Sequence, residues 1–218
     1  MRYRSIRRGL AWLGATMLWF AFATSPFAAE PLKGRQLVDA LKAGGYTLYF
    51  RHFETGADTA DQHLVKLGDC ATQRQLNARG AMQAIQVRDA FVKLNIPVGD
   101  VLASPFCRAW QSADLSFGRH VIVDGLKLPP SKDYTDADKR LMRDLLVPLL
   151  AKAPASGRNT IIMGHDDNLP AAGGPEIKTQ GEAVVIKSVG KGGFTVIGTI
   201  KPGRWVTLSR QLPLTPTH

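Results

Sequence analysis

Two histidines each follow a short apolar run of β-prone residues, and this arrangement constrains the fold more than any other feature of the chain. Residues 46–50 form the first run and lead directly into Arg51 and His52, while residues 160–163 form the second run, shortly before His165. The carboxyl ends of parallel strands in an α/β sheet converge on one crevice, where ligands usually bind. We therefore expect both histidines to lie in one site.

A third expected strand, residues 101–103, leads into a helix over residues 108–117. This order places Arg108 near a helix start, where free amide groups and a partial positive charge favour anions. The planar guanidinium group suits phosphate oxygens. Together with Arg51 and the two imidazoles, Arg108 would complete a compact anion-binding site.

The rest of the chain alternates expected helices and strands. Asn77 can cap a helix that ends before Pro97. Thr135 and Asp138 resemble a capping box for another helix, which Pro148 should kink or end. Further elements are expected as a helix at residues 34–43 and as strands at residues 183–187 and 194–200, paired in a hairpin around residues 190–193. This alternation predicts an α/β sandwich.

With these elements in place, the chain resembles the histidine phosphatase superfamily, also called phosphoglycerate mutase-like. The hallmark of that family is an Arg-His pair after the first strand. The matching pieces lie, in chain order, at residues 48–52, 76–80, 104–109 and 164–165. A narrower likeness to a little-characterised bacterial subgroup rests on residues 69–74, 104–108 and 181–183. The resemblance covers residues 46–200 and implies a three-layer sandwich with a mainly parallel sheet.

The resemblance also implies a chemistry. His52 would be the nucleophile and would form a phosphohistidine that water then hydrolyses. Arg51, Arg108 and His165 would hold the phosphate oxygens, and no metal or other cofactor would be needed. The physics of the side chain agrees, since a neutral imidazole presents a lone pair at physiological pH and two smaller steps replace one high barrier.

The acid that protonates the leaving group has three candidates. Asp166 directly follows His165 and resembles the His-Asp pair of the acid phosphatase and phytase branch, where the aspartate donates the proton. That branch carries an extra arginine soon after its first motif, which this chain lacks. Glu54 and Glu182 therefore remain rivals to Asp166.

Two further positions bear on the site. The family has glycine after its first histidine, whereas this chain has Phe53, whose bulk could narrow the pocket or tilt its backbone. Arg74 is either an additional phosphate contact or a solvated loop residue, and the second interpretation is somewhat favoured.

The first 29 residues differ in kind from the rest. Four arginines precede an apolar stretch at residues 10–22, and small residues follow. This order is typical of a secretory signal peptide, with residues 30–218 as the folded domain and a periplasmic or secreted location. The alternative is an uncleaved membrane anchor, which would be the chain's one connection to a membrane; the cleavage site stays open, and a twin-arginine signal matches poorly.

Charge and composition narrow the partners. The 218 residues are 44% hydrophobic and 21% charged, which suits one domain with a sizeable core. The formal net charge is +10. A positive surface would attract a small phosphorylated substrate. No dense basic run or aromatic-basic platform is present, so nucleic acid is not an expected partner.

Export makes the two cysteines informative. Cys70 and Cys107 could form a disulfide in an oxidising compartment, or could remain two buried thiols. A disulfide would hold the loop at residues 69–74 beside Arg108. Two cysteines without tight Cys/His spacing make a zinc site an unfavoured alternative.

Three functional classes follow from these patterns. The leading hypothesis is an exported phosphatase that hydrolyses phosphomonoesters. A phosphoglycerate mutase is disfavoured because its substrate is cytoplasmic. The alternative is a non-catalytic protein of the same fold that binds phosphate or another anion through Arg51, Arg108 and His165 without a competent acid.

Overall fold

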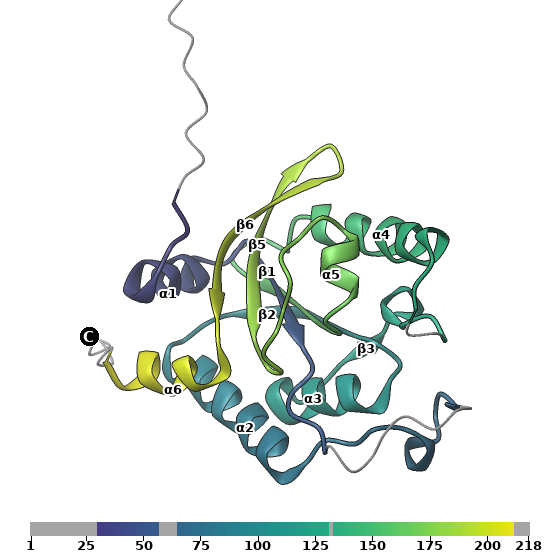
Figure 1. Ribbon diagram of the computed structural model, residues 1–218. Coiled ribbons are helices and arrows are strands. Elements are labelled where there is room, and N and C mark those ends of the chain that lie inside the picture. Colours follow the sequence, from purple (N-terminus) through teal and green to yellow (C-terminus); the bar gives the residue numbers. More distant parts are fainter. Residues whose placement is uncertain (1–29, 57–64, 131–132, 212–218) are drawn as a thin grey trace, which may run out of the picture.

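A twisted sheet of six strands forms the centre of the molecule (Figure 1). The computed structural model describes residues 30–56, 65–130 and 133–211, so the expected signal peptide lies outside the described residues. In chain order the strands are β1 (Thr47–Arg51), β2 (Val98–Ala103), β3 (Val121–Ile122), β4 (Asn159–Gly164), β5 (Ala183–Gly190) and β6 (Gly193–Ile200).

The strands lie in the order β3-β2-β4-β1-β5-β6. The first four in this order are parallel to one another, whereas β5 pairs antiparallel with both β1 and β6. Pairing of β1 with β4 sets Arg51 opposite Gly164, so His52 and His165 emerge side by side at the carboxyl edge. The expectation of a mainly parallel sheet and of a late hairpin is confirmed.

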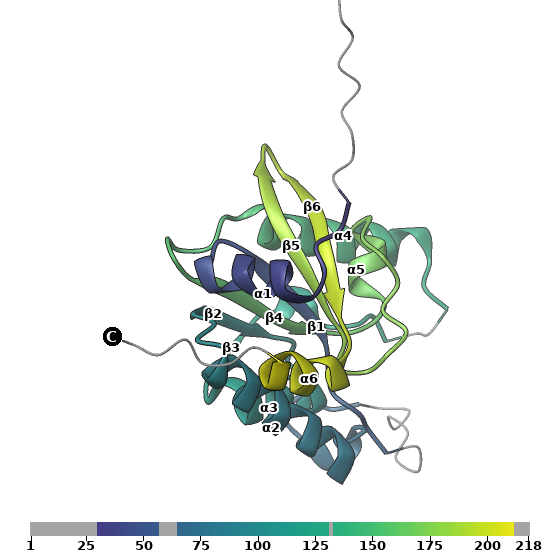
Figure 2. The ribbon, with the colours of Figure 1, turned by 90° about the vertical axis from the view of Figure 1, so that its left-hand side faces the viewer.

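Helices cover both faces of the sheet, which confirms the three-layer sandwich (Figures 1 and 2). The helices are α1 (Gly34–Ala43), α2 (Ala78–Lys93), α3 (Cys107–Phe117), α4 (Asp136–Ala151), α5 (Asn168–Ala171) and α6 (Pro202–Gln211), with short 3-10 turns η1 (Cys70–Thr72) and η2 (Asp124–Leu126). Helices α1, α2, α3 and α6 pack on Leu48 and Phe50, while α4 and α5 pack on Tyr49. Alternate residues of β1 therefore face opposite cores.

Local sequence explains where α2 and α4 begin. The side chain of Asn77 accepts a hydrogen bond from the amide of Gly80 at 2.7 Å, which caps α2 as expected. Thr135 and Asp138 form the expected capping box of α4. That helix continues to Ala151, so Pro148 does not end it at once, because a proline this close to the carboxyl end removes one intrahelical bond and leaves the last turn in place.

The sequence did not predict α6. Its Trp205 is fully buried, 4.9 Å from the ring of Phe91 and 6.3 Å from that of Phe50 between centroids, and it closes the core between α2 and the sheet. Within the described ranges, we find no helix with the length and apolar character needed to cross a membrane.

Candidate active site

His52 lies just beyond β1 and is fully buried. Its main-chain amide donates to the carbonyl of Gly164 at 2.9 Å, which fixes the backbone at the edge of the sheet. Its Nδ1 lies 2.8 Å from the carbonyl oxygen of Phe53. A carbonyl only accepts, so Nδ1 carries the hydrogen. In the neutral ring Nε2 then holds a lone pair, and within the described part of the chain this buried atom has no hydrogen-bond partner.

The surroundings keep that ring neutral. Burial lowers the pKa of His52 well below the ordinary value of 6.5, and the charges of Arg108, Arg74 and Arg51 lower it further. Protonation would place a cation inside a buried, positively charged site, which is unfavourable. Nε2 is therefore available as a nucleophile at neutral pH.

His165 is the second buried imidazole of the site. The ring centroids of His52 and His165 are 5.6 Å apart, in an edge-on arrangement. Nε2 of His165 is hydrogen-bonded to Oγ of Ser104 at 2.8 Å, while its buried Nδ1 has no partner among the described residues. Burial, followed by the charge of Arg108, lowers the pKa of His165 as well. The two histidines meet as the sequence predicted.

Tyr49 holds the main chain of His165 in place. Its hydroxyl donates to the carbonyl of His165 at 2.9 Å and accepts from the amide of His165 at 3.1 Å. A side chain at Gly164 would meet this hydroxyl at 2.2 Å, which explains the glycine. Sequence reasoning missed this role because Tyr49, inside an apolar run, has the pattern of an ordinary core residue.

Arg51 is anchored on three sides. Its Nη1 donates to the carbonyls of Ile177 and Lys178 at 3.0 Å, and its Nη2 lies 2.7 Å from the carboxylate of Asp166. A guanidinium group has five N–H donors. Three are used here, and the buried Nε–H has no partner in the described ranges. Arg51 is thus positioned with donors left for an anion.

Arg108 lies in the first turn of α3 and is 1% exposed. Its guanidinium carbon is 4.5 Å from the centroid of the Phe106 ring, which itself lies 5.1 Å from the His165 ring. The aromatic face stabilises the buried cation. The helix N-terminus adds its own partial positive charge. The sequence placed Arg108 at this helix start, and the structure confirms that position.

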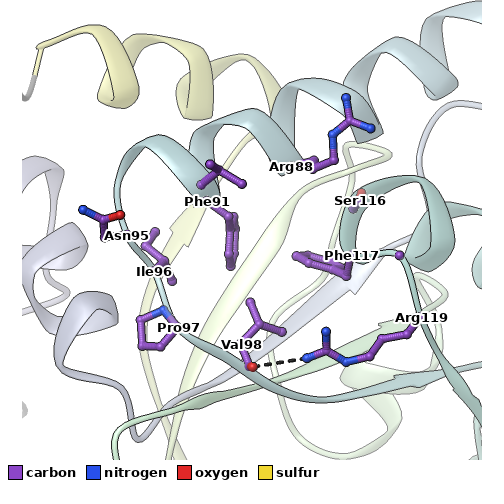
Figure 3. Close-up of a pocket in the computed structure, with 11 residues that line it drawn as sticks. Arg88, Phe91, Asn95, Ile96, Pro97, Val98, Ser116, Phe117 and Arg119 are labelled. Carbon is purple, nitrogen blue, oxygen red and sulfur yellow. Dashed lines mark hydrogen bonds between the residues drawn. The ribbon is translucent and has the colours of Figure 1, made fainter. Parts of the chain in front are cut away.

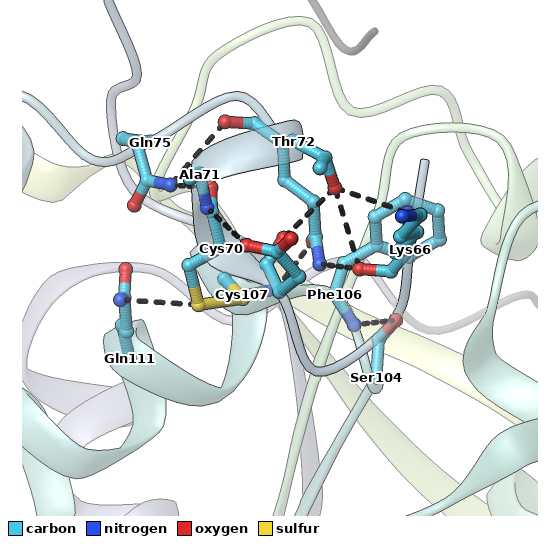
Figure 4. Close-up of a disulfide and its surroundings, with 11 residues drawn as sticks. Lys66, Cys70, Ala71, Thr72, Gln75, Ser104, Phe106, Cys107 and Gln111 are labelled. Atoms are coloured by element: carbon cyan, nitrogen blue, oxygen red, sulfur yellow. Dashed lines mark hydrogen bonds between the residues drawn. A yellow bond between two sulfur atoms is a disulfide. The ribbon is translucent and has the colours of Figure 1, made fainter. Parts of the chain in front are cut away.

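A disulfide joins the loop before Arg74 to α3, as Figure 4 shows. Cys70 and Cys107 are bonded, with their Cα atoms 5.7 Å apart. Of the two alternatives that the sequence left open, a disulfide or two buried thiols, the structure has the disulfide. The buried Gln73 adds a second connection, since its Oε1 accepts from the amide of Cys107 at 2.9 Å. These two links hold Arg74 beside the site, where its charge lowers the pKa of both histidines. Arg74 is thus a partly buried loop residue beside the site, and its contact with phosphate stays a prediction.

The acidic residues differ in position. Asp166 faces Arg51, as described above. Glu54 follows β1 in the chain and lies beside the start of α2. There it accepts a hydrogen bond from the Asn77 side chain at 3.1 Å and faces Arg79 at 3.8 Å. Glu182 contacts the site through its main chain, whose carbonyl accepts from the amide of Arg51 at 3.1 Å. Asp167, which the sequence did not single out, is the remaining carboxylate near Arg51.

Phe53 points away from this cluster. Its side chain is fully buried in the core beside Phe50, with 6.2 Å between the ring centroids. A side chain at Gly181 would meet its ring at 2.6 Å. The bulk of Phe53 is thus accommodated by a glycine in the neighbouring loop, and its amide donates to Oγ of Ser112 at 3.1 Å.

A shallow pocket of about 660 Å³ lies elsewhere, between α2, α3 and the amino end of β2 (Figure 3). Phe91 and Phe117 line it, and Arg119 at its edge donates to the carbonyl of Val98 at 3.2 Å. It occupies the opposite edge of the sheet from His52 and does not belong to the histidine site. Among the described residues, no three His, Cys, Asp or Glu side chains are grouped as metal ligands.

No family model and no curated protein matches the chain by sequence. Solved structures do match. The protein histidine phosphatase SixA, complexed with tungstate, superposes with a TM-score of 0.53 and 15% identity over 73% of this chain and 98% of that chain. The chain has the histidine phosphatase fold.

Two further structures share the histidine phosphatase fold. A candidate alpha-ribazole-5′-P phosphatase from Escherichia coli matches with a TM-score of 0.54 and 17% identity, over 73% of this chain and 98% of that chain. A mutant phosphoserine phosphatase from Entamoeba histolytica, in complex with phosphoserine, matches with a TM-score of 0.50 and 13% identity, over 72% and 97%. At these identities the likeness concerns the fold, which confirms the expected superfamily architecture.

Proposed function

We propose that this chain is an exported phosphatase that hydrolyses phosphomonoesters through a phosphohistidine intermediate. The observation that carries the proposal is the state of His52: a main-chain carbonyl fixes the hydrogen on Nδ1, and the free Nε2 lies among three arginines. A neutral nucleophile beside several cations suits the attack on a phosphate dianion.

The residues divide the chemistry among them. Nε–H of Arg51 and the guanidinium of Arg108 donate to the phosphate oxygens and stabilise the charge that spreads over them in the transition state. Oγ of Ser104 is hydrogen-bonded to Nε2 of His165, and in the tautomer in which the hydroxyl donates, Nδ1 of His165 carries the hydrogen that it can offer to the anion. Nε2 of His52 then bonds to phosphorus as the ester P–O bond breaks. In the second step water attacks phosphorus, the N–P bond breaks and inorganic phosphate leaves.

Several observations support this substrate class. A positive site built from arginines and imidazoles selects a phosphate group rather than a neutral ester. The related SixA structure holds tungstate, and the related phosphoserine phosphatase structure holds phosphoserine. Export rests on the sequence of residues 1–29, and a disulfide beside the site suits an oxidising compartment.

The test is hydrolysis of p-nitrophenyl phosphate by the full chain without added metal. We expect turnover in the wild type and a loss of about 10⁴-fold or more in His52→Ala, as for other lost nucleophiles. His120→Ala is the matched control, because His120 pairs with Asp114 at 2.6 Å outside the site and its loss should leave turnover intact. Acid-labile phosphate should be trapped on the wild type and be missing from His52→Ala.

One result would overturn the proposal in favour of the alternative. If the wild type and His52→Ala both fold and both bind inorganic phosphate, but neither hydrolyses aryl or alkyl phosphates, the chain is a non-catalytic phosphate-binding protein of this fold.

A further inference from the structure

A tyrosine and an aspartate form a pair beside the phosphate site, and neither has a place in the scheme above. Tyr134 precedes α4 and Asp167 precedes α5, so the two residues lie far apart in the sequence. The Tyr134 hydroxyl donates to Oδ2 of Asp167 at 3.3 Å. Both residues are half-buried. The pair thus joins the ends of two helices on one side of the histidine cluster.

The charged and titratable groups around Asp167 are those of the site itself. Asp166 is its neighbour in the chain, Arg51 acts on it from β1, and Tyr134 acts on it from the segment before α4. Tyr49, which holds the main chain of His165, lies close enough to be affected by the charge of Asp167. The carboxyl group therefore lies within the field of the proposed phosphate site.

Tyr134 shows the same proximity from the other side. Its hydroxyl is affected by the charge of Arg108, the buried arginine of α3, as well as by Asp166 and Asp167. Arg51 thus acts on Asp167 and Arg108 acts on Tyr134, so the charges of both arginines reach the pair. These two arginines are the ones proposed to hold the phosphate, so the Tyr134–Asp167 pair adjoins the proposed phosphate site.

We propose that Asp167, rather than Asp166, is the acid that protonates the leaving-group oxygen. The inference rests on the proposed phosphatase function. As Nε2 of His52 bonds to phosphorus and the ester P–O bond breaks, the Asp167 O–H bond breaks and its proton moves to the departing oxygen. In the second step the Asp167 carboxylate takes a proton from the attacking water, which restores the acid.

The two neighbouring aspartates differ in their suitability for this role. Asp166 lies 2.7 Å from Nη2 of Arg51, and such an ion pair requires a charged carboxylate, whereas a proton donor must be neutral before it acts. Burial raises the pKa of Asp167, and the nearby Asp166 raises it further. The Tyr134 hydrogen bond and the charge of Arg51 act in the opposite direction without cancelling the rise.

The test compares two substrates that need an acid to different extents. p-Nitrophenolate leaves readily without a proton, whereas the alkoxide of ethyl phosphate does not. We expect Asp167→Asn to lower kcat/KM for ethyl phosphate by about 10²–10⁴-fold, the usual contribution of a general acid, and for p-nitrophenyl phosphate by less than about tenfold. The variant should also lose the fall in ethyl phosphate hydrolysis that the wild type shows as pH rises through the pKa of its acid.

Two matched variants separate a proton donor from a residue that only supports the fold. Asp166→Asn should lower kcat/KM for both substrates by the same factor, because it disturbs Arg51 and therefore phosphate binding. Tyr134→Phe removes the hydrogen bond that lowers the pKa of Asp167, so the alkaline fall in ethyl phosphate hydrolysis should move to higher pH. Thermal unfolding confirms that each variant is folded.

The outcomes distinguish this inference from the proposed function. If the wild type hydrolyses p-nitrophenyl phosphate and His52→Ala does not, the phosphatase proposal stands. Suppose that Asp167→Asn instead lowers kcat/KM equally for both substrates, while Asp166→Asn lowers it more for ethyl phosphate than for p-nitrophenyl phosphate. Asp166 is then the acid, and the inference is overturned. The inference is also overturned if neither variant loses more kcat/KM for ethyl phosphate than for p-nitrophenyl phosphate.

Discussion

At the scale of single residues, the site is a group of arginines arranged around two neutral imidazoles. Arg51 and Arg108 have fixed contacts with the fold, through main-chain carbonyls and the Phe106 ring respectively. Arg74 is different, since it reaches the site from a loop and is only half-buried. Its charge lowers the pKa of both histidines, and its side chain belongs to neither of the two hydrophobic core clusters.

We predict that Arg74→Ala weakens binding of inorganic phosphate by about tenfold to a hundredfold, the usual value of a hydrogen bond or close contact to a charged group. Loss of this cation should also raise the pKa of His52, so activity should begin to fall at a higher pH as the solution is acidified. Calorimetric titration with phosphate and the acidic part of the kcat/KM profile measure the two effects.

Arg79→Ala is the matched control for this prediction. The Arg79 side chain is 77% exposed and faces Glu54 at 3.8 Å. Arg79 is not among the arginines whose charges lower the pKa of His52 or His165, so its loss should change neither phosphate affinity nor the pH profile. Equal effects of the two substitutions would show that overall positive charge, rather than the position of Arg74, attracts the anion.

At the scale of elements, the disulfide and Gln73 hold the loop of η1 against the start of α3. The first is covalent and closes a loop between residues 37 positions apart, and the second satisfies the first free amide of the helix. Their combined effect is to position Arg74 relative to Arg108. The disulfide therefore supports the site as well as the fold.

We predict that the double variant Cys70→Ala/Cys107→Ala has a free energy of unfolding lower by about 4 kcal/mol, the loop-closure value for residues 37 positions apart. Phosphate affinity should fall toward that of Arg74→Ala, because the loop is less well held. Urea unfolding and phosphate titration measure these changes. Wild type treated with dithiothreitol should behave in the same way, and unchanged phosphate affinity in both samples would contradict the positioning role.

Some of these elements could be predicted from the sequence and others could not. Strand ends and helix starts could be predicted, because apolar runs and caps such as Asn77 are local signals. The sequence therefore predicted the positions of Arg51, His52, Arg108 and His165 at the ends of these elements. The pair of Tyr134 and Asp167 could not be predicted, since it depends on how α4 and α5 pack. The strand β3 is only two residues long, and the Pro-Gly start of α6 has the pattern of a turn.

The Ser104–His165 contact could not be predicted from the sequence for the same reason. The contact joins the end of β2 to the end of β4, and its two residues are 61 positions apart in the sequence. It depends on the register of the sheet rather than on a motif. Local patterns therefore predict which residues approach the site. Tertiary packing decides which atoms face one another there.

At the scale of the whole molecule, the buried histidines make stability depend on pH. Both His52 and His165 have a pKa below 6.5 in the folded state, while the unfolded chain has ordinary histidines. As pH falls below 6.5, the unfolded state takes up protons that the folded state excludes. The free energy of unfolding is therefore highest above that pH and decreases on acidification.

We predict that His52→Asn isolates one of these two contributions. Between about pH 7 and pH 5, the stability of the wild type should fall relative to that of the variant by up to about 1.4 kcal/mol per pH unit below the ordinary histidine pKa. Asp167 has a raised pKa and acts in the opposite direction, but it is present in both proteins and cancels in the difference. Urea unfolding at several pH values, with the disulfide intact, measures this difference. A difference that stays constant across this range would mean that His52 is protonated as readily in the folded protein as in the unfolded chain, which contradicts a buried neutral nucleophile.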